Sequence, residues 1–213
     1  MIEPDDVKKT AVLQVPTCQP LQQYLIALGA SQAAVERYLP QFKALNVPAG
    51  EVLLGQGDEQ SQAYFVVDGI VRACHYTQEG TERCKEFYFE GELCFLYVSW
   101  LKQIPARYQL EALSACKLIQ MPLSVLDDTS LQSVQLGLLK QQLLYKEQKE
   151  AFLLLHTPEQ RYLYLREHLP LWLERLSQGQ LANYIGITAI SLSRMRRRLQ
   201  DSLLRFLLPV NLS

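Results

Sequence analysis

Between residues 47 and 121 the chain alternates short apolar runs with glycine-containing polar breaks. Runs such as residues 63–67 and 70–76 are rich in valine, isoleucine and aromatic residues, which favour strands. They recur at the roughly 8–12-residue spacing typical of antiparallel sandwiches and barrels. The segment 78–81 has the composition of a hairpin turn between two of them. We therefore predict a small antiparallel β domain over this region.

A long helix is predicted after the β domain, because residues 131–156 hold one glycine and no proline. Its leucines fall in two neighbouring stripes, Leu136, Leu139 and Leu143 in one and Leu138 and Leu144 in the other. Two stripes suit two partners, the chain's own β domain and the same helix of a second subunit. We favour a homodimer through residues 131–156 over the alternative of one broad buried face.

Both ends of the chain show weaker helical signals. Residues 1–20 lack clear periodicity and are predicted to form a loose arm, while 21–44 follow a helical pattern broken by Gly29 and by Pro40. Two capping boxes predict helix starts further on, one at Thr157 and one at Ser177, each with glutamine three residues later. The first of these helices is expected to stop before Pro170.

Residues 181–199 carry the pattern of a helix-turn-helix. Ala182 is small where two helices would cross, and Gly186 four residues later suits a sharp turn that benefits from positive φ. The apolar anchors of the two helices are Leu181, Ile185, Ile187, Leu192, Met195 and Leu199. This combination of small residue, glycine and anchors predicts DNA binding through the second helix.

The outward face of that second helix, residues 188–200, supplies the candidate DNA contacts. Arginine can bond guanine in a bidentate way, so Arg194 and Arg197 suit base or phosphate contacts in a major groove. The hydroxyls of Thr188 and Ser191 suit phosphate oxygens near the helix start. The full predicted set is Thr188, Ala189, Ile190, Ser191, Ser193, Arg194, Arg197 and Arg198. An ordinary helical hairpin with a basic exposed face is the alternative.

The distribution of charge supports a polyanionic partner. The formal net charge of −1 hides an acidic body, since residues 1–156 hold 13 Lys and Arg against 18 Asp and Glu. Residues 157–213 hold 8 against 4, a net of +4. Such asymmetry is typical of chains with a nucleic-acid-binding part. We expect the partner to be double-stranded DNA, read as a palindrome by the dimer.

Composition places the chain among ordinary globular proteins. Of its 213 residues 48% are hydrophobic and 20% charged, which excludes a mainly disordered chain. No secretory signal is recognisable at the start, and no apolar run approaches the roughly 20 residues of a membrane span. We therefore expect a cytoplasmic location without membrane association. Five scattered cysteines without a C-x-x-C pair, and three scattered histidines, predict no metal site.

Two glycine-rich segments carry a resemblance to a known family. Residues 50–58 and 64–72 are similar to the signatures of the cyclic-nucleotide-binding-like β-roll, and with the following helix and helix-turn-helix the chain resembles the CRP/FNR superfamily of bacterial transcription regulators. The resemblance implies an α+β fold with a jelly-roll-like β-roll, a dimerisation helix and RNA polymerase as a partner. The implied divisions are an arm (1–20), the β-roll with flanking helices (21–124), the dimerisation helix (125–156) and the DNA-binding domain (157–213).

The chain departs from the cyclic-AMP-binding members of this family. They follow Gly-Glu-Leu with an Arg-Ser pair that grips the cyclic phosphate, whereas here Gly91 and Glu92 are present but the stretch 104–112 has no Arg-Ser. Arg107 lies one position away from the place where those members have the arginine of the pair. Gly91, Glu92 and Arg107 are the candidate effector residues, with ordinary loop residues as the alternative. Because a buried phosphate without its arginine is poorly compensated, we expect an effector other than cyclic AMP, of unknown identity.

Other sensing chemistries of the family lack support in the sequence. The redox-sensing branch uses an N-terminal cysteine cluster for an iron–sulfur centre, and only Cys18 lies in that region. His75 is a conceivable haem ligand, although a lone histidine in a strand is more often structural. No cofactor is therefore predicted. Only fourteen residues follow Leu199, so we expect a reduced or absent wing, with the apolar residues 203–208 packing back on the core.

Two other functions compete with DNA binding. A cyclic-nucleotide-domain sensor that acts on a protein partner would share the β-roll without using its C-terminal helices on DNA. A cupin-type enzyme would need clustered metal ligands, and the sequence has no H-x-H, no phosphate loop and no Ser/His/Asp set. We therefore predict a DNA-binding regulator that is not an enzyme, with the protein-partner sensor as the alternative.

Overall fold

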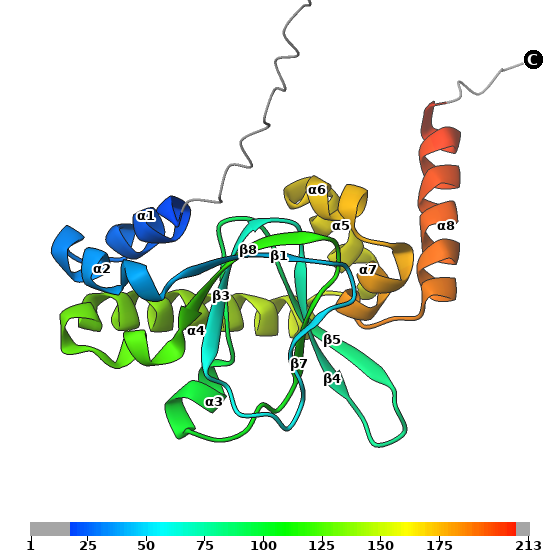
Figure 1. Cartoon of the computed structure of the whole chain (residues 1–213). Helices are drawn as coiled ribbons and strands as arrows, with labels where there is room; N and C mark the ends of the chain where they lie inside the picture. The colour runs from blue at the N-terminus through cyan, green and yellow to red at the C-terminus, as the bar shows by residue number, and fades with distance from the viewer. Residues whose placement is uncertain (1–17, 208–213) are drawn as a thin grey trace, which may run out of the picture.

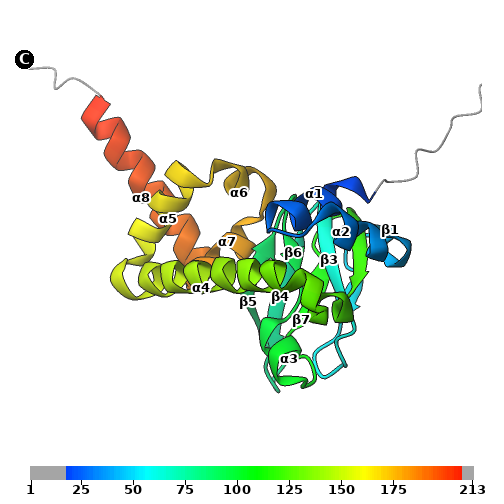
Figure 2. The same cartoon turned by 90° about the vertical axis from the view of Figure 1, so that its left-hand side faces the viewer.

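A computed structural model describes residues 18–207, with side chains as far as Asp201. Two sheets form the middle of the molecule, and the long helix α4 (Gln132–Leu155) runs past them (Figures 1 and 2). Helices α1 and α2 lie near one end of α4, helices α5 to α7 lie beside its C-terminal half, and α8 projects from that side (Figures 1 and 2). This arrangement confirms the predicted α+β fold with an antiparallel β-roll followed by helices.

The N-terminal helices begin earlier than the predicted arm allows. Most of the arm expected over residues 1–20 lies outside the described residues, but α1 (Gln19–Ala27) already starts at Gln19. Ser31 caps α2 (Gln32–Tyr38) by accepting a hydrogen bond from the Ala34 amide at 3.2 Å. The break between the two helices occurs at Gly29, whose φ of 102° is the left-handed conformation that glycine tolerates. A 3₁₀ turn, Leu39–Gln41, accommodates Pro40 and leads into the first strand.

Eight strands form two four-stranded antiparallel sheets, ordered β1-β8-β3-β6 and β2-β7-β4-β5. The strands are β1 (Lys43–Val47), β2 (Val52–Leu54), β3 (Gln62–Asp68), β4 (Val71–Tyr76), β5 (Glu82–Tyr88), β6 (Leu93–Cys94), β7 (Gln109–Ala112) and β8 (Cys116–Pro122). Between β6 and β7 the chain forms the short helix α3 (Tyr97–Lys102). The non-sequential strand orders place distant segments side by side, as in a jelly roll.

Two apolar cores hold this part of the chain. One includes Val66, Leu110 and Leu118, which come from both sheets and are fully buried. The other joins the first sheet to α1, α2 and α4, and Leu138 of α4 belongs to it. Because α4 contributes to the second core, its position against the β-roll is set by packing.

Helix α4 is shorter than the predicted range 125–156. The β-roll covers leucines from both predicted stripes, so the stripes do not separate the two partners. Residues 123–131 form two 3₁₀ turns, Leu123–Asp127 and Thr129–Leu131, so the α-helix begins at Gln132. Val134 and Leu138 are buried against the β-roll and Leu139 is half-buried there. The leucines left exposed are Leu136, Leu143, Leu144, Leu153, Leu154 and Leu155.

The C-terminal helices are α5 (Pro158–His168), α6 (Pro170–Arg175), α7 (Gln178–Ile185) and α8 (Ala189–Leu207). Both predicted capping boxes form, the first between Thr157 and Gln160 and the second between Ser177 and Gln180. The sequence pattern missed α6. Pro170 does end the preceding helix, but its fixed φ also suits the first position of a new one.

The chain end differs from the expectation of a tail that packs on the core. Helix α8 continues through Leu207 and points away from the rest of the molecule (Figures 1 and 2). As far as Leu207, the described chain after Leu199 is helical. Residues 208–213, which include the last residue of the predicted apolar tail, lie outside the described residues. Within the described part of the chain, no helix is long and apolar enough to cross a membrane.

The core assignment predicts unequal costs for two leucine truncations. Leu110 is 0% exposed between the sheets, so Leu110→Ala should lower the free energy of unfolding by about 2–5 kcal/mol. Leu101 of α3 is 57% exposed, so Leu101→Ala should change it by about 0.5 kcal/mol or less. Urea unfolding followed by circular dichroism measures both, and equal losses in the two variants would contradict the assignment.

Candidate nucleic-acid interface and effector cavity

Helices α7 and α8 form the predicted helix-turn-helix. Gly186 has φ of 81°, and the Ile187 amide donates to the Ala182 carbonyl at 2.9 Å to close the turn. Leu192 and Met195 of α8 are 0% and 4% exposed and pack in one cluster with α7. The anchors therefore fix the side of α8 that faces inward, and its opposite side faces solvent.

The first turn of α8 is organised by the two predicted hydroxyl residues. Thr188 precedes the helix, and its Oγ1 accepts a hydrogen bond from the Ser191 amide at 3.1 Å. The two hydroxyl oxygens lie 2.9 Å apart. Both side chains are exposed, so the hydroxyls that we expect to contact phosphate lie together at the positive end of the helix dipole.

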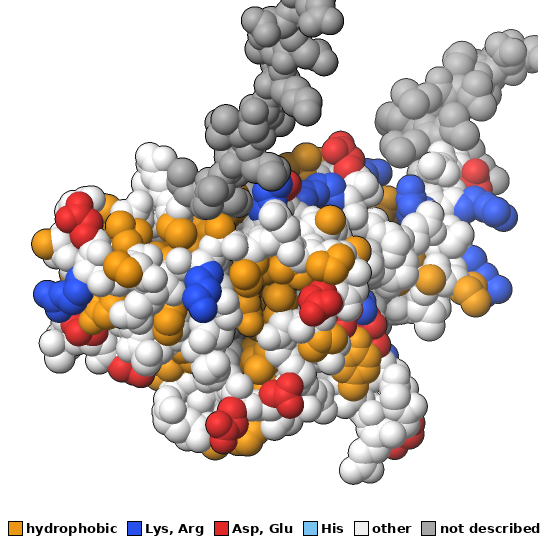
Figure 3. All heavy atoms as spheres, viewed as in Figure 1, with side chains coloured by type: hydrophobic (Ala, Val, Ile, Leu, Met, Phe, Trp, Pro, Cys, Tyr) orange, Lys and Arg blue, Asp and Glu red, His pale blue; other side chains and the backbone are white. Residues whose placement is uncertain are grey.

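The remaining predicted contact residues are brought to the exposed side of α8. Ile190 is 66% exposed, and the others on this side are Ala189, Ser193, Arg194, Arg197 and Arg198. Lys and Arg side chains gather along the projecting helix in Figure 3. Arg198 also lies 3.5 Å from the Glu159 carboxylate of α5, at the edge of the face. The structure thus places the whole predicted set on one basic, solvent-facing surface.

An apolar cluster joins the C-terminal helices to the outer face of the second sheet. Phe87 of β5 and Ile70 contribute to it from the β domain. Trp172 of α6 stacks on Phe89 with ring centroids 5.2 Å apart, and Arg175 of the same helix makes two 2.7 Å hydrogen bonds to Glu90. The helix-turn-helix is therefore docked on the β domain.

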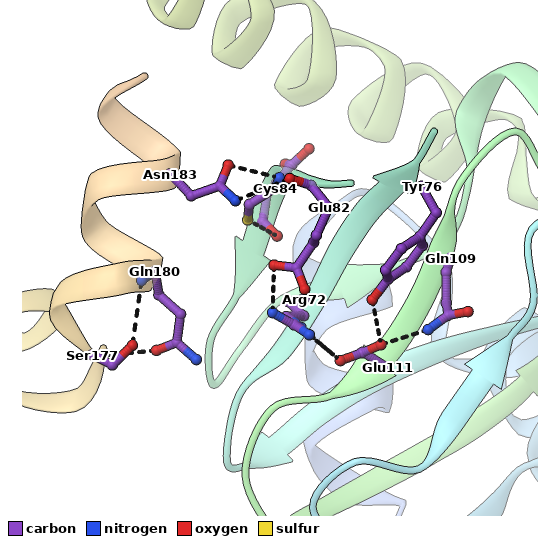
Figure 4. Close-up of polar contacts among 10 residues, drawn as sticks. Arg72, Tyr76, Glu82, Cys84, Gln109, Glu111, Ser177, Gln180 and Asn183 are labelled. Carbon is purple, nitrogen blue, oxygen red and sulfur yellow. Dashed lines mark hydrogen bonds and ion pairs between the residues drawn. The ribbon is translucent and has the colours of Figure 1, made fainter. Parts of the chain in front are cut away.

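Asn183 of α7 makes the most specific contact across this junction. Its Oδ1 accepts from the Cys84 amide at 3.1 Å and its Nδ2 donates to the Glu82 carbonyl at 3.3 Å (Figure 4). Strand β5 is at the edge of its sheet, so these backbone groups have no neighbouring strand. The Asn183 side chain pairs with them as a strand would. No sequence pattern indicates this role of Asn183, because the contact depends on docking between segments about a hundred residues apart.

A buried polar network lies on the same sheet beside this contact. Arg72 of β4 bonds Glu111 at 2.6 Å and Glu82 at 2.8 Å, and Tyr76 and Gln109 also bond Glu111 (Figure 4). Arg72 is therefore fully engaged in cross-strand ion pairs. It is not available to bind an anion.

A cavity of about 290 Å³ lies between the β domain, α1 and α4. Its lining consists of Tyr24, Glu86, Tyr88, Gly91, Glu92, Leu93, Tyr97, Gln141, Gln142 and Tyr145. Gly91 and Glu92 were predicted as effector residues, and both line it. Arg107 was predicted with them, but it is an exposed residue outside the lining. The four tyrosines and Glu86 were missed, because no periodic pattern marks residues that converge from separate elements.

The cavity is acidic and aromatic. The Glu86 carboxylate is neutralised by Lys146 of α4 at 3.0 Å and by Lys85 at 3.3 Å. Glu92 accepts a 2.6 Å hydrogen bond from the Phe89 amide. Its side chain reaches the surface of the protomer, yet the crowded mouth of the cavity desolvates the carboxylate and raises the pKa of Glu92 to about 7. With no arginine in its lining, the cavity offers no bidentate partner for a phosphate.

His75 and Cys18 are the residues on which haem binding and iron–sulfur binding would depend. His75 packs against the ring of Tyr108 at 5.1 Å, and burial lowers its pKa. Cys18 is half-buried just before α1, and burial raises the pKa of its thiol. Within residues 18–201, no three or more His, Cys, Asp or Glu side chains are grouped to hold a metal ion.

Comparison with known proteins shows which proteins the chain resembles. Residues 44–132 match the model of the cyclic nucleotide-binding domain, which corresponds to the β domain described above. The fumarate and nitrate reduction regulatory protein of Yersinia pestis is 26% identical over 178 residues, covering 73% of this chain and 68% of the relative. The transcriptional activator protein Anr of Pseudomonas protegens is 26% identical over 204 residues, covering 88% and 80%.

The chain is therefore similar to regulators of the CRP/FNR superfamily. Solved structures share the fold described above, a β-roll followed by helices. The c-di-GMP-responsive global regulator CLP of Xanthomonas campestris superposes with a TM-score of 0.65 at 19% identity, covering 81% of this chain and 93% of CLP. FixK2 of Bradyrhizobium japonicum gives a TM-score of 0.63 at 18% identity, covering 76% of this chain and 85% of FixK2.

The electrostatics of Glu90 and Glu92 predict opposite pH responses for these two neighbouring glutamates. The pKa of Glu92 is raised from 4.5 to about 7, so the native state holds a proton that the unfolded chain releases. Wild-type stability should therefore fall, relative to Glu92→Gln, as pH rises from 4.5 to 7. Urea midpoints of both proteins at pH 4.5 and 8 measure the difference.

Glu90→Gln is the matched control with the opposite sign. The Arg175 hydrogen bonds lower the pKa of Glu90 from 4.5 to about 2. The wild type should therefore be more stable than Glu90→Gln at pH 8 and should lose that advantage as pH falls from 4.5 toward 2. An identical pH response of the wild type and Glu92→Gln would show that the cavity does not perturb Glu92.

Proposed function

We propose that the protein is a dimeric transcription regulator that reads an inverted DNA repeat with α8 and responds to a small molecule in the cavity beside α4. The observation that carries the proposal is the basic outer face of α8, which Leu192 and Met195 hold outward on a docked helix-turn-helix. The names of the relatives support the same function, since they are regulatory proteins and a transcriptional activator. RNA polymerase is the further partner that the family suggests.

DNA recognition by α8 follows from its shape and charge. The helix projects from the molecule (Figure 1), and a major groove admits one α-helix. Arg194 and Arg197 are exposed on its outer side and are long enough to reach base edges. Thr188 and Ser191 lie at its start, where backbone amides also point at phosphate.

Dimerisation through α4 follows from the leucines that its own β domain does not cover. Leu136, Leu143 and Leu154 are 52%, 61% and 73% exposed, and their spacing of seven and eleven residues puts them on one side of the helix. A stripe of exposed leucines on one helix is stabilised by the same stripe of a second copy. Two copies related by a two-fold axis would present two α8 helices to an inverted repeat.

The effector is expected to be neutral or cationic rather than a cyclic nucleotide. The cavity is lined by Glu92 and by tyrosines, and its buried Glu86 is already paired with lysines. Arg107 lies outside the lining, so a phosphate there would lack a countercharge. We therefore expect cyclic AMP to bind weakly or not at all.

Substitution of Arg194 tests DNA recognition. Arg194→Ala should weaken binding to the preferred site by about 1–3 kcal/mol and relax base preference there, because a base contact is lost. The preferred site is found by selection from random duplexes and should be an inverted repeat, with half-site centres about 10–10.5 base pairs apart or a multiple of that. Fluorescence anisotropy at two salt concentrations then gives affinity and salt dependence.

Arg107→Ala is the matched control, since it removes one exposed arginine from the segment between α3 and β7, outside the helix-turn-helix, and should leave DNA affinity unchanged. A selection without a palindrome, together with an unchanged affinity of Arg194→Ala, would favour the sensor that acts on a protein partner.

Charges on the exposed leucine stripe test dimerisation. The double variant Leu136→Glu and Leu143→Glu should sediment as a monomer, because two carboxylates would be buried in the seam. These positions are used in place of Leu139, which packs partly on its own β domain. Leu101→Glu, at a 57% exposed leucine of α3, should remain dimeric. A double variant that is folded by circular dichroism and still dimeric would refute this interface.

A further inference from the structure

Two of the five cysteines lie directly opposite each other on neighbouring strands. Cys74 of β4 pairs with Cys84 of β5 in the antiparallel register, just after a bulge in the ladder. Directly opposite residues of antiparallel strands place their side chains on the same face of the sheet. The two thiols are free in this structure, Cys74 buried and Cys84 partly exposed.

The hydrogen bonds of β5 show which kind of pair this is. The Cys84 amide and the Glu82 carbonyl both point outward to Asn183, away from β4. Cys84 therefore occupies a non-hydrogen-bonded position of the ladder, where opposite Cα atoms are about 4.5 Å apart and the side chains are closest. A disulfide needs a Cα separation of about 4.4–6.8 Å, so the backbone geometry suits one without rearrangement.

The surroundings of the pair activate one of the two sulfurs. The Cys74 thiol stabilises the Cys84 thiolate by a hydrogen bond and lowers the pKa of Cys84, and the Lys149 ammonium of α4 acts in the same direction. The same interaction raises the pKa of Cys74, together with burial. Thiolates rather than thiols react with oxidants, so Cys84 is the attacking group and Cys74 the resolving one.

We propose that Cys74 and Cys84 are a redox-active dithiol that a hydroperoxide oxidises to an intramolecular disulfide. The Cys84 thiolate attacks one peroxide oxygen, which forms a sulfur–oxygen bond, breaks the oxygen–oxygen bond and releases hydroxide. The Cys74 sulfur then attacks the Cys84 sulfenic acid. The Cys74 proton joins the hydroxide that leaves the sulfenic acid, and the proton that Cys84 lost on ionisation joins the hydroxide released from the peroxide. Two thiols and one hydrogen peroxide therefore give one disulfide and two waters.

The position of the pair connects it to the docked helix-turn-helix. The Cys84 side chain packs against the apolar cluster that joins the sheet to the C-terminal helices, and its amide is held by Asn183 of α7. Formation of the disulfide draws the Cys84 sulfur toward β4 and away from that cluster. The oxidation state of the pair therefore affects β5, the strand to which Asn183 of α7 is hydrogen-bonded. This inference goes beyond the proposed function and does not depend on DNA binding.

Thiol mapping of the full-length protein tests the proposal. The reduced protein is treated with hydrogen peroxide, its free thiols are alkylated at intervals, and its peptides are analysed by mass spectrometry. Cys84 should lose its free thiol about tenfold faster than Cys18, which is also partly exposed but has no thiol partner among the described residues. A peptide that links Cys74 to Cys84 within one chain should then accumulate and disappear on reduction.

Two variants separate the steps. In Cys74→Ser the reaction should stop at a Cys84 sulfenic acid that dimedone traps, and in Cys84→Ser the thiol of Cys74 should remain free. Equal oxidation rates of Cys84 and Cys18, or a Cys84 disulfide to any sulfur other than Cys74, would overturn the proposal. The wild-type mapping decides the matter even if the buried Cys74→Ser variant fails to fold.

Discussion

The outer face of one sheet must be covered, and the C-terminal helices cover it. Strand β5 alternates so that Tyr88 belongs to the core between the sheets while Phe87 faces the opposite way. Leaving Phe87 and its neighbours in water would sacrifice the hydrophobic stabilisation of several large side chains. Trp172 and Tyr184 take that place beside Phe87, and the helix-turn-helix is thereby fixed to the β domain. The direction in which α8 points is a result of this packing.

The parts of the structure that follow from local chemistry could be predicted from the sequence. Thr157 and Ser177 cap their helices as the spacing of serine or threonine and glutamine indicates, since both partners lie within one turn. Gly186 takes positive φ where the turn between two helices requires it. Leu192 and Met195 are buried because their spacing keeps them on one side of α8.

The features that depend on contacts between distant segments could not be predicted. Tyr24 and Tyr145 meet at the cavity although 121 positions separate them in the sequence, and only the course of α1 and α4 past the sheet brings them together. Leu139 packs partly on the β-roll while Leu144 is exposed, and the stripes alone do not indicate this, because the position of α4 on the β-roll decides which leucines are covered. Arg107 was expected beside Gly91 and Glu92 from its position in the sequence alone, yet it lies outside the lining of the cavity.

The pairing of Asn183 with β5 has a consequence for any rearrangement of the C-terminal helices. An edge strand with free amides and carbonyls is a template on which a strand of another molecule can add, and proteins shield such edges against aggregation. Here a single amide side chain shields the middle of the edge at Cys84 and Glu82. If the helix-turn-helix swings away from the sheet, these groups become available for intermolecular pairing. Movement of the DNA-binding part would require Asn183 to leave β5, whereas protection of the β domain against aggregation requires Asn183 to stay there.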